Sequence, residues 1–167
     1  MIWSDKVIRK AANQFPIVEP FCNDLVQPNS YEVRLADRII VQRYSEGIFE
    51  DKEVTLPYLM RRGDFVLGST IEKVNIPNGV VIQVDGKSTF GRFGLIVHFT
   101  AGLCDSGFCG NITLEMMSFV RPVQLTAGMK IAQLVFQDSY ECEQLYGQCN
   151  NHYQNQEGAT RAWTEKQ

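Results

Sequence analysis

The sequence has few of the residues that build metal sites or disulfide frameworks. Its 167 residues include only two histidines, His98 and His152, and an odd number of cysteines, five. No two cysteines form a Cys-x-x-Cys pair, which is the spacing typical of structural zinc sites. We therefore expect no zinc site, and we expect reduced cysteines that mostly serve packing.

Long apolar runs and a strong charge imbalance are also missing. No segment approaches the roughly 20 apolar residues that span a bilayer, and the first residues, MIWSDKVIRK, turn polar too early for a signal peptide. The net charge of −3 gives no reason to expect a nucleic-acid-binding surface. These absences favour a cytoplasmic protein without membrane or nucleic-acid partners, although a local positive patch for a small anion stays open.

A complete phosphate-binding P-loop is absent as well. Residues 85–92 read DGKSTFGR, and the letters GKST resemble the end of that motif. The motif requires a second glycine five residues before the Gly-Lys pair, and this chain has Val81 there. The sequence therefore excludes a P-loop ATPase, and the segment needs another explanation.

The segments that are present predict a mainly β protein with one domain, residues 1–167. After residue 31, β-branched stretches such as YEVRLADRIIVQ alternate with glycine, proline and asparagine at roughly 8–12-residue spacing, as in a sandwich or barrel. Residues 4–15 predict a short helix that begins at Ser4, and a one-turn helix is expected near 88–93. Residues 146–167 form a polar C-terminal tail.

Two local features could carry chemistry, and each has a plain structural alternative. On a helical turn, Ser88 and Arg92 share one face and could surround an anion together with Lys87 and Thr89. The alternative is a capped surface turn with a solvated arginine. Glu115 lies among apolar residues of a predicted central strand. Facing inward, it would need an arginine or a ligand and would be a candidate general base, whereas facing solvent it would be unremarkable.

Two further polar residues have simple interpretations. Asp105 begins the turn signal Asp-Ser-Gly and could merely cap its own turn. His98, in LIVHFT, is expected to be a hydrogen-bonded histidine within a strand. The His-x-Glu and Pro-Cys-x-x-Cys patterns of zinc-dependent nucleoside deaminases are both missing. Any hydrolytic chemistry in this chain must therefore activate water without zinc.

Several motifs in order resemble those of the dCTP deaminases, relatives of the trimeric dUTPases. LVQPNSYEVRLAD is similar to the family's Gln-Pro-x-Ser-Tyr-Asp-x-Arg-Leu segment, and GKSTFGRFGLIVHFTAGLCDSGFCGNITLEM is similar to its central signature. AGMKIAQLVF and YQNQEG resemble the closing strands and the substrate-covering tail. The resemblance covers nearly the whole chain.

This resemblance implies a fold, an assembly and a catalytic set. The fold would be a distorted dUTPase-like β-barrel, assembled as a homotrimer whose active sites are shared between neighbouring subunits, with residues 146–167 covering the site. The catalytic set would be Ser88, Arg92, the Ala101 carbonyl and Glu115. Glu115 would act as general base and then general acid on a water that attacks C4 of cytosine. The other three would position that water and stabilise the developing charge.

The resemblance also implies a substrate site and its metal. Mg²⁺ would bind through the substrate triphosphate, and the protein itself would hold no metal. Several positions depart from the family pattern, and two of them weaken the match at the triphosphate: Lys87 replaces an arginine and His152 replaces a lysine. Thr89 replaces a serine, and Leu103 and Cys104 stand where an aromatic or basic residue and an isoleucine are common. The implied substrate-binding residues are Lys87, Ser88, Thr89, Arg92, Asp105, Thr113, Leu114, Glu115, Gln133, Tyr146 and Gln156.

The sequence leaves the overall reaction open. The first hypothesis is a hydrolase that converts dCTP into dUTP and ammonia, feeding dUMP and dTTP synthesis. The alternative is a bifunctional enzyme that makes dUMP, ammonia and pyrophosphate, with Asp105 helping a second water attack the α-phosphorus. A pure dUTPase and a nucleotide-binding regulator without turnover are weaker alternatives. Binding of dUTP and inhibition by dTTP, as in many relatives, also stay open.

Overall fold

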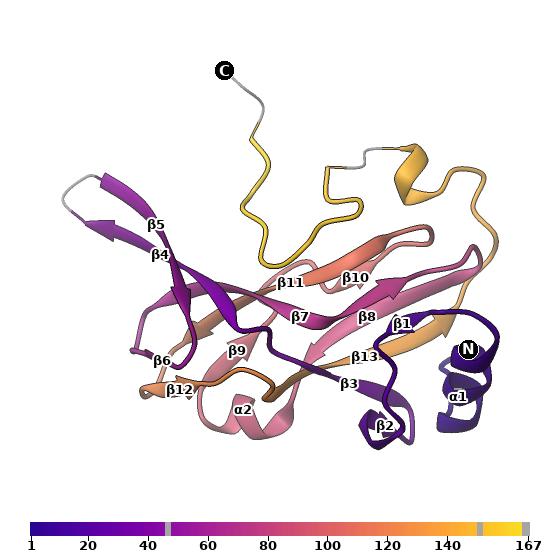
Figure 1. Ribbon diagram of the computed structural model, residues 1–167, viewed down its shortest axis with the longest axis horizontal. Helices are drawn as coiled ribbons and strands as arrows, with labels where there is room; N and C mark the ends of the chain where they lie inside the picture. Colours follow the sequence, from indigo (N-terminus) through magenta and orange to yellow (C-terminus); the bar gives the residue numbers. More distant parts are fainter. Residues whose placement is uncertain (46–47, 150–151, 165–167) are drawn as a thin grey trace.

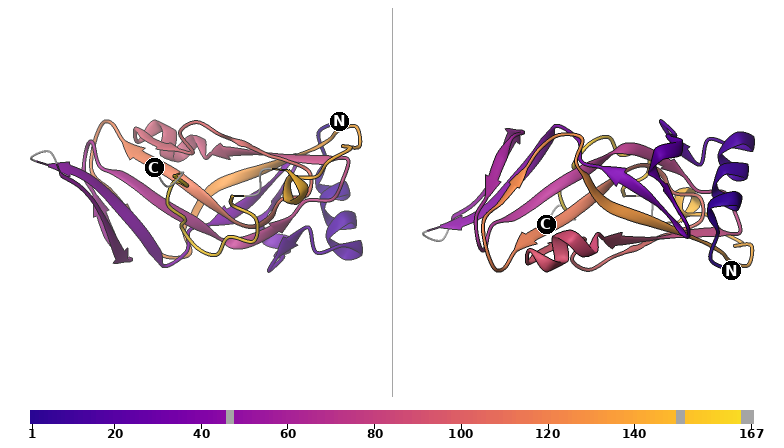
Figure 2. Two further views of the ribbon diagram at one scale, coloured as in Figure 1. Left: turned by 90° about the horizontal axis from the view of Figure 1, so that it is seen from above. Right: turned by 90° about the horizontal axis from the view of Figure 1, so that it is seen from below.

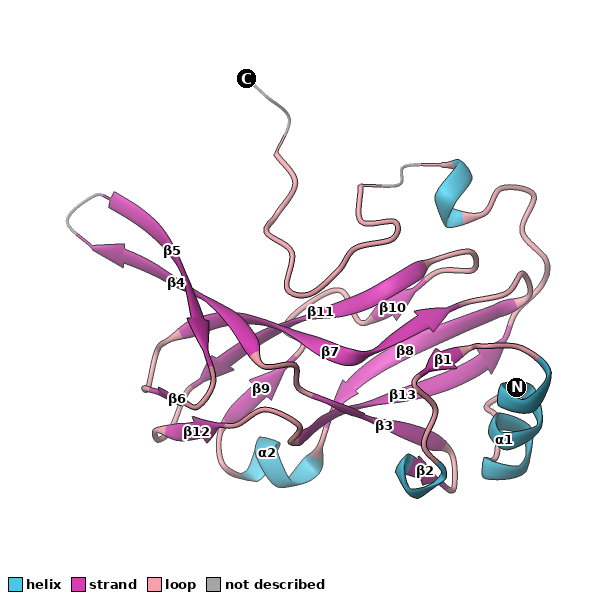
Figure 3. Ribbon diagram, viewed as in Figure 1, coloured by secondary structure: helices cyan, strands magenta, loops and turns pink. Residues whose placement is uncertain are grey.

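The structure is a computed structural model that describes residues 1–45, 48–149 and 152–164. Two antiparallel sheets face each other and form most of the molecule (Figures 1 and 3). The all-β expectation is therefore confirmed. None of the described helices is long and apolar enough to cross a membrane.

The first sheet has the strand order β5-β4-β7-β11-β9, and β1 pairs with β7 beside this path. Strands β4 and β5 form a hairpin that projects from one end of the molecule (Figure 1). The strands of this sheet are β1 (Val18–Glu19), β4 (Arg38–Ser45), β5 (Ile48–Thr55), β7 (Phe65–Asn75), β9 (Leu95–Val97) and β11 (Cys109–Ser118).

The second sheet has the order β10-β8-β13-β3-β2, and a separate pair joins β12 to β6. Its strands are β2 (Val26–Gln27), β3 (Ser30–Arg34), β8 (Val80–Gly86), β10 (Leu103–Cys104) and β13 (Lys130–Asp138). The separate pair consists of β6 (Tyr58–Met60) and β12 (Val123–Leu125).

Alternation along the strands creates one shared core. In β11, Leu114 and Met116 are fully buried while the residues on either side of Met116 are only half-buried. They belong to the same apolar cluster as Ile82 of β8 and Phe136 of β13. Because neighbouring side chains of a strand point to opposite faces, the other face of β11 stays available for a site.

The helices match the expectations from sequence closely. Helix α1 spans Asp5–Gln14 with Ser4 at its N-cap, although the serine side chain makes no capping bond there. The one-turn helix α2 spans Ser88–Arg92. Two 3₁₀ turns, η1 (Asn23–Leu25) and η2 (Tyr146–Gln148), complete the helical elements of the described chain. Figure 2 shows α1 at one end of the molecule, away from the β4–β5 hairpin.

Some strand boundaries differ from the sequence-based expectation. The segment 31–42 was expected as one strand, but it divides into β3 and β4, which belong to different sheets. Residues 35–37 make the crossing, since the main chains of Leu35 and Ala36 bond to Met129 and Ser69. Strands β5 and β6 were not predicted. The charge-rich sequence of β5, IFEDKEVT, lacks the alternation that marks a half-buried strand.

Candidate active site

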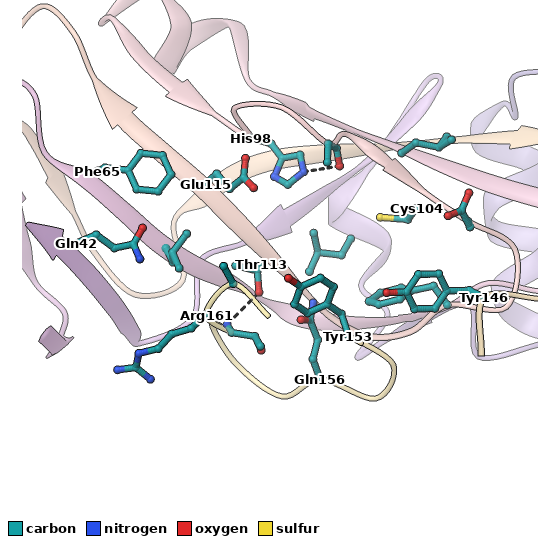
Figure 4. A pocket seen from close by; sticks show the side chains of 18 residues that line it. Gln42, Phe65, His98, Cys104, Thr113, Glu115, Tyr146, Tyr153, Gln156 and Arg161 are labelled. Atoms are coloured by element: carbon teal, nitrogen blue, oxygen red, sulfur yellow. Dashed lines mark hydrogen bonds between the residues drawn. The ribbon is translucent and has the colours of Figure 1, made fainter. Parts of the chain in front are cut away.

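A cavity of about 410 Å³ lies between β11, β10, the turn after β9 and the C-terminal tail (Figure 4). This volume is within the range of pockets that hold small molecules. Glu115 and His98 lie at its middle, with Phe65 and Gln42 toward one end and Cys104 and Tyr146 toward the other. Five of the predicted site residues line the cavity together with Glu115: Ala101, Asp105, Thr113, Tyr146 and Gln156.

The structure resolves which way Glu115 faces. Its side chain points away from the apolar core into the cavity, where it is only half-buried. Glu115 Oε2 accepts hydrogen bonds from the main-chain N–H and the hydroxyl of Thr100, each at 3.2 Å. A carboxylate that is held in a cavity by neutral donors, with no cation bound to it among the described residues, is suited to proton transfer.

The turn after β9 brings a carbonyl to the same place. The main-chain N–H of His98 donates to the Glu115 carbonyl at 2.9 Å, and His98 Nε2 lies 2.8 Å from the Ala101 carbonyl oxygen. A carbonyl can only accept, so Nε2 donates this hydrogen bond. Nδ1 is buried and has no partner among the described residues.

His98 departs from its sequence-based interpretation. It follows β9 instead of lying within a strand, and its φ of 64° is in the left-handed region that non-glycine residues seldom adopt. The strained backbone turns the chain sharply enough to place residues 98–101 around Glu115. Strain of this kind concentrates at functional sites, and the sequence LIVHFTAG gives no signal for it.

The other end of the cavity has an aromatic and acidic lining. Phe108 and Tyr146 pack edge to face with ring centroids 5.4 Å apart, and the exposed Asp105 lies in the adjoining turn. Burial raises the pKa of the Tyr146 hydroxyl. Burial, with a contribution from Asp105, raises the pKa of the Cys104 thiol to about 12, so both groups stay protonated near neutral pH.

The C-terminal tail closes one side of the cavity and runs alongside β11. Gln156 forms a parallel bridge with Gly110, and its side chain donates to the Asn111 carbonyl at 2.6 Å. Further along, the Thr160 N–H donates to the Thr113 hydroxyl at 3.1 Å. A β-carbon on Gly110, whose φ is 141°, would lie 2.9 Å from the Gln156 carbonyl oxygen. Glycine is therefore needed for this approach.

An arginine fixes the end of the described tail. Arg161 Nε donates to Asp51 Oδ2 at 3.0 Å, and its terminal nitrogens lie 3.3 Å from Glu53 Oε1. Both acids belong to β5. His152 stacks on Trp163 with ring centroids 3.7 Å apart. Sequence reasoning missed Arg161 as a cavity residue because its acidic partners lie far away in the chain.

The remaining predicted residues do not line this cavity. Ser88, Thr89 and Arg92 are exposed on α2, which lies at the edge of the molecule opposite the tail (Figure 1). No hydrogen bond or ion pair joins Ser88 or Arg92 to Glu115 in the described part of the chain. One chain therefore supplies only Glu115 and Ala101 of the predicted catalytic set. The side chain of Leu114 is fully buried in the core, so this residue would reach a ligand only through its main chain.

Lys87 and Gln133 lie in a separate polar cluster. Lys87 pairs with the buried Glu32, whose second oxygen pairs with Lys130 at 2.9 Å. Burial alone would raise the pKa of Glu32, but the hydrogen bonds from Lys87 and Lys130 outweigh it and lower the pKa below its usual value. Gln133 accepts a hydrogen bond from the Ser30 hydroxyl at 3.3 Å. Sequence reasoning did not single out Glu32 or Lys130.

The cysteines form no disulfide bonds, and the described residues form no cluster of metal ligands. All five cysteines are unpaired. Within residues 1–45, 48–149 and 152–164, no group of three or more His, Cys, Asp and Glu side chains gathers as metal ligands would. The cavity offers the carboxylates of Asp105 and Glu115, together with carbonyls and hydroxyls, to a ligand.

The family model and two similar curated proteins point to the same family. Residues 2–139 match the sequence model described as dCTP deaminase-like. The chain is 37% identical to a protein of Dictyoglomus turgidum named dCTP deaminase, dUMP-forming, over 96% of this chain and 93% of that protein. It is also 37% identical to a protein of the same name from Thermobifida fusca, over 96% of this chain and 91% of the relative.

Solved structures support the fold. The 2'-deoxycytidine 5'-triphosphate deaminase of Agrobacterium tumefaciens superposes with a TM-score of 0.72 at 20% identity, covering 83% of this chain. This chain spans about half the length of that protein, 48%. A mutant dUTPase of Staphylococcus bacteriophage 80alpha, solved with dUpNHpp, gives a TM-score of 0.51 at 14% identity over 76% of this chain and 92% of that one. The dUTPase-like fold expected from the sequence is confirmed, and the chain belongs to the dCTP deaminase-like family.

Proposed function

We propose that this protein hydrolyses dCTP to dUMP, releasing ammonia and pyrophosphate. The observation that carries the proposal is Glu115, a half-buried carboxylate in a nucleoside-sized cavity with the Ala101 carbonyl beside it. The names of the relatives, dUMP-forming, favour this bifunctional outcome over release of dUTP.

The deamination step uses Glu115 as a proton shuttle. Its carboxylate takes a proton from water while the oxygen of that water attacks C4 of the cytosine ring. The proton then passes to N3, and a second proton passes from the new hydroxyl through Glu115 to the amino group, which leaves as ammonia. The Ala101 carbonyl has a second lone pair free to orient the water, because His98 occupies only one.

We further propose that Ser88 and Arg92 reach Glu115 from a second copy of the chain. Both are exposed on α2, and Arg92 has no ion-pair partner among the described residues. A guanidinium brought beside the cavity would keep Glu115 ionised and stabilise the charge that develops on the ring, worth about 2–4 kcal/mol for a fixed donor. One chain alone would leave the proposed catalytic set incomplete, which supports a homotrimer with shared sites.

The surface beside α2 suits contact with such a copy. Phe93, Phe119 and Val120 are 39%, 44% and 69% exposed. They lie together, since the Phe119 N–H bonds to the Gly94 carbonyl and Arg121 covers the Phe93 ring at 4.1 Å. An apolar patch of this kind next to a functional arginine is typical of a subunit interface.

The substrate enters as the Mg²⁺ complex of dCTP, with the ion on the triphosphate. This fits the described donor set, which has no carboxylate cluster to hold a metal of its own. Asp105 and Tyr146 line the cavity and would bind the deoxyribose. Lys87, Ser88, Thr89 and Gln133 would bind the triphosphate, and the tail with Gln156 would cover the nucleotide.

The second hydrolysis breaks the bond between the α-phosphorus and the oxygen that bridges to the β-phosphate. A second water attacks the α-phosphorus, and pyrophosphate leaves with the bridging oxygen. Asp105 is the carboxylate of the cavity other than Glu115, and we assign it the role of orienting or deprotonating this water. dUTP would then be an intermediate of the reaction.

Product analysis tests the proposal. The purified protein is incubated with dCTP and Mg²⁺, and ammonia and nucleotides are quantified over time. We expect ammonia, dUMP and pyrophosphate in equal amounts. Accumulation of dUTP with ammonia would support a monofunctional deaminase instead. Binding of dCTP without release of ammonia would overturn the enzymatic proposal and leave a nucleotide-binding regulator.

A further inference from the structure

Thr100 makes an unusual double contact with Glu115. Its main-chain N–H and its hydroxyl both donate to the same carboxylate oxygen, Oε2, each at 3.2 Å. The other oxygen, Oε1, has no hydrogen-bond partner among the described residues. The two oxygens of Glu115 are therefore not equivalent, because one is occupied by the protein and one is free for a ligand.

The backbone around Thr100 is held in place by the same turn. Val97 of β9 pairs with Met116 of β11, and the His98 N–H bonds to the Glu115 carbonyl at 2.9 Å. The ring of His98 then bonds to the Ala101 carbonyl oxygen at 2.8 Å (Figure 4). Thr100 lies between these two fixed points, so its donors stay aimed at Glu115.

We propose that Thr100 is a positioning residue for deamination, which holds Glu115 Oε2 and thereby leaves Oε1 as the oxygen that exchanges protons with water and substrate. This inference rests on the proposed function of Glu115. A glutamate side chain has three rotatable bonds, and fixing it before the substrate arrives removes an ordering cost from the reaction.

The position of Thr100 separates this role from packing. Thr100 is exposed and lies outside the apolar core. Replacement by valine keeps the size and the β-branched shape and removes only the hydroxyl, while the main-chain N–H remains. If Thr100 served packing alone, the Thr100→Val protein would therefore keep a kcat close to that of the native protein.

The test compares Thr100→Val with the conservative Thr100→Ser in steady-state dCTP deamination. Thr126→Val serves as the control, because Thr126 is exposed in the turn before β13. We expect Thr100→Val to lower kcat by about 10- to 100-fold, the effect of one hydrogen bond to a charged group, with KM changed by less than about three-fold. Thr100→Ser should retain kcat within about three-fold of the native value.

The other outcomes overturn the proposal in distinguishable ways. A native kcat for Thr100→Val shows that the hydroxyl does not act through Glu115. A loss of kcat in the serine variant with a native valine variant points to packing of the methyl group, and a raised KM at native kcat points to substrate binding. Melting temperatures identify a variant that fails to fold, and the serine variant then decides. If the native protein releases no ammonia from dCTP, the proposed function fails first, independently of Thr100.

Discussion

Arg161, near the end of the chain, forms an ion pair with Asp51 on the β4–β5 hairpin, with Nε and Oδ2 3.0 Å apart. A second contact joins the same guanidinium to Glu53. The tail therefore closes over the cavity of its own chain and is held by a hairpin that lies 110 residues earlier in the sequence. This pairing adds to the hydrogen bonds that join the tail to β11.

Loss of the Arg161 side chain should loosen the tail. We expect Arg161→Ala to speed chymotrypsin cleavage after Tyr153 and Trp163 by several-fold, because exposed ion pairs contribute about 0.2–1 kcal/mol each. Added salt should increase cleavage of the native tail and leave the variant unaffected. Arg9→Ala, which breaks an ion pair with Asp5 on α1, is the control. Equal cleavage of the Arg161→Ala and Arg9→Ala proteins would contradict the role of Arg161 in holding the tail.

Glu115→Gln should abolish deamination and spare binding. The amide keeps the shape of the side chain but cannot accept a proton, so we expect kcat to fall by at least about 10³-fold. The dissociation constant for dCTP with Mg²⁺, measured by calorimetry, should stay within about five-fold of the native value. Loss of binding as severe as the loss of turnover would show that Glu115 has a structural role.

Glu32→Gln should reveal a pH-dependent contribution to stability. Lys87 and Lys130 lower the pKa of Glu32 below 4.5 despite its burial, so the carboxylate stabilises the folded state above about pH 4.5. That contribution is lost as the pH falls through the lower folded-state pKa. In urea unfolding, Glu32→Gln should be less stable by about 1–3 kcal/mol at pH 7, with the difference shrinking toward pH 3.

The matched control for this change is Glu143→Gln, since Glu143 is exposed. It should match the native free energy of unfolding at both pH values when protein concentrations are equal. A destabilisation of Glu32→Gln that stays constant from pH 7 to pH 3 would mean that the charge of Glu32 is not the cause.

Cys104 should be the least reactive of the cavity and surface thiols. Burial and Asp105 raise its pKa to about 12, whereas Cys142 is exposed. Iodoacetamide reacts with thiolates, so at pH 8 Cys104 should be alkylated at least about 100-fold more slowly than Cys142. Peptide mass spectrometry over a time course measures both rates. Comparable rates would show that the cavity is open to solvent at Cys104.

The sequence predicts much of this fold for identifiable reasons. Apolar alternation in NITLEMM places Glu115 on a strand between buried residues, as β11 shows. The helix-cap signal and the local glycine pattern locate α1 and α2 within a residue or two. Such signals depend only on residues close together in the chain. They predict the elements correctly because the apolar faces that they define are the faces that pack in the folded protein.

The rest depends on contacts between distant residues. Whether Glu115 meets solvent or a cavity is decided by the left-handed backbone at His98 and by the tail, and neither is encoded next to Glu115. Glu32 was missed because its two lysine partners come from other strands and turns. The motif match groups Ser88, Arg92 and Glu115 without indicating whether they meet within one chain or between neighbouring chains.

Subunit mixing tests the shared site most directly. Arg92→Ala and Glu115→Gln proteins are each purified, shown to be inactive, and then mixed under conditions that exchange subunits. If Arg92 serves the Glu115 of a neighbouring copy, random mixing creates sites with both native residues, and about a quarter of native deamination returns. If both residues serve one chain, every site keeps one defect and the mixture stays inactive, which would contradict the shared site.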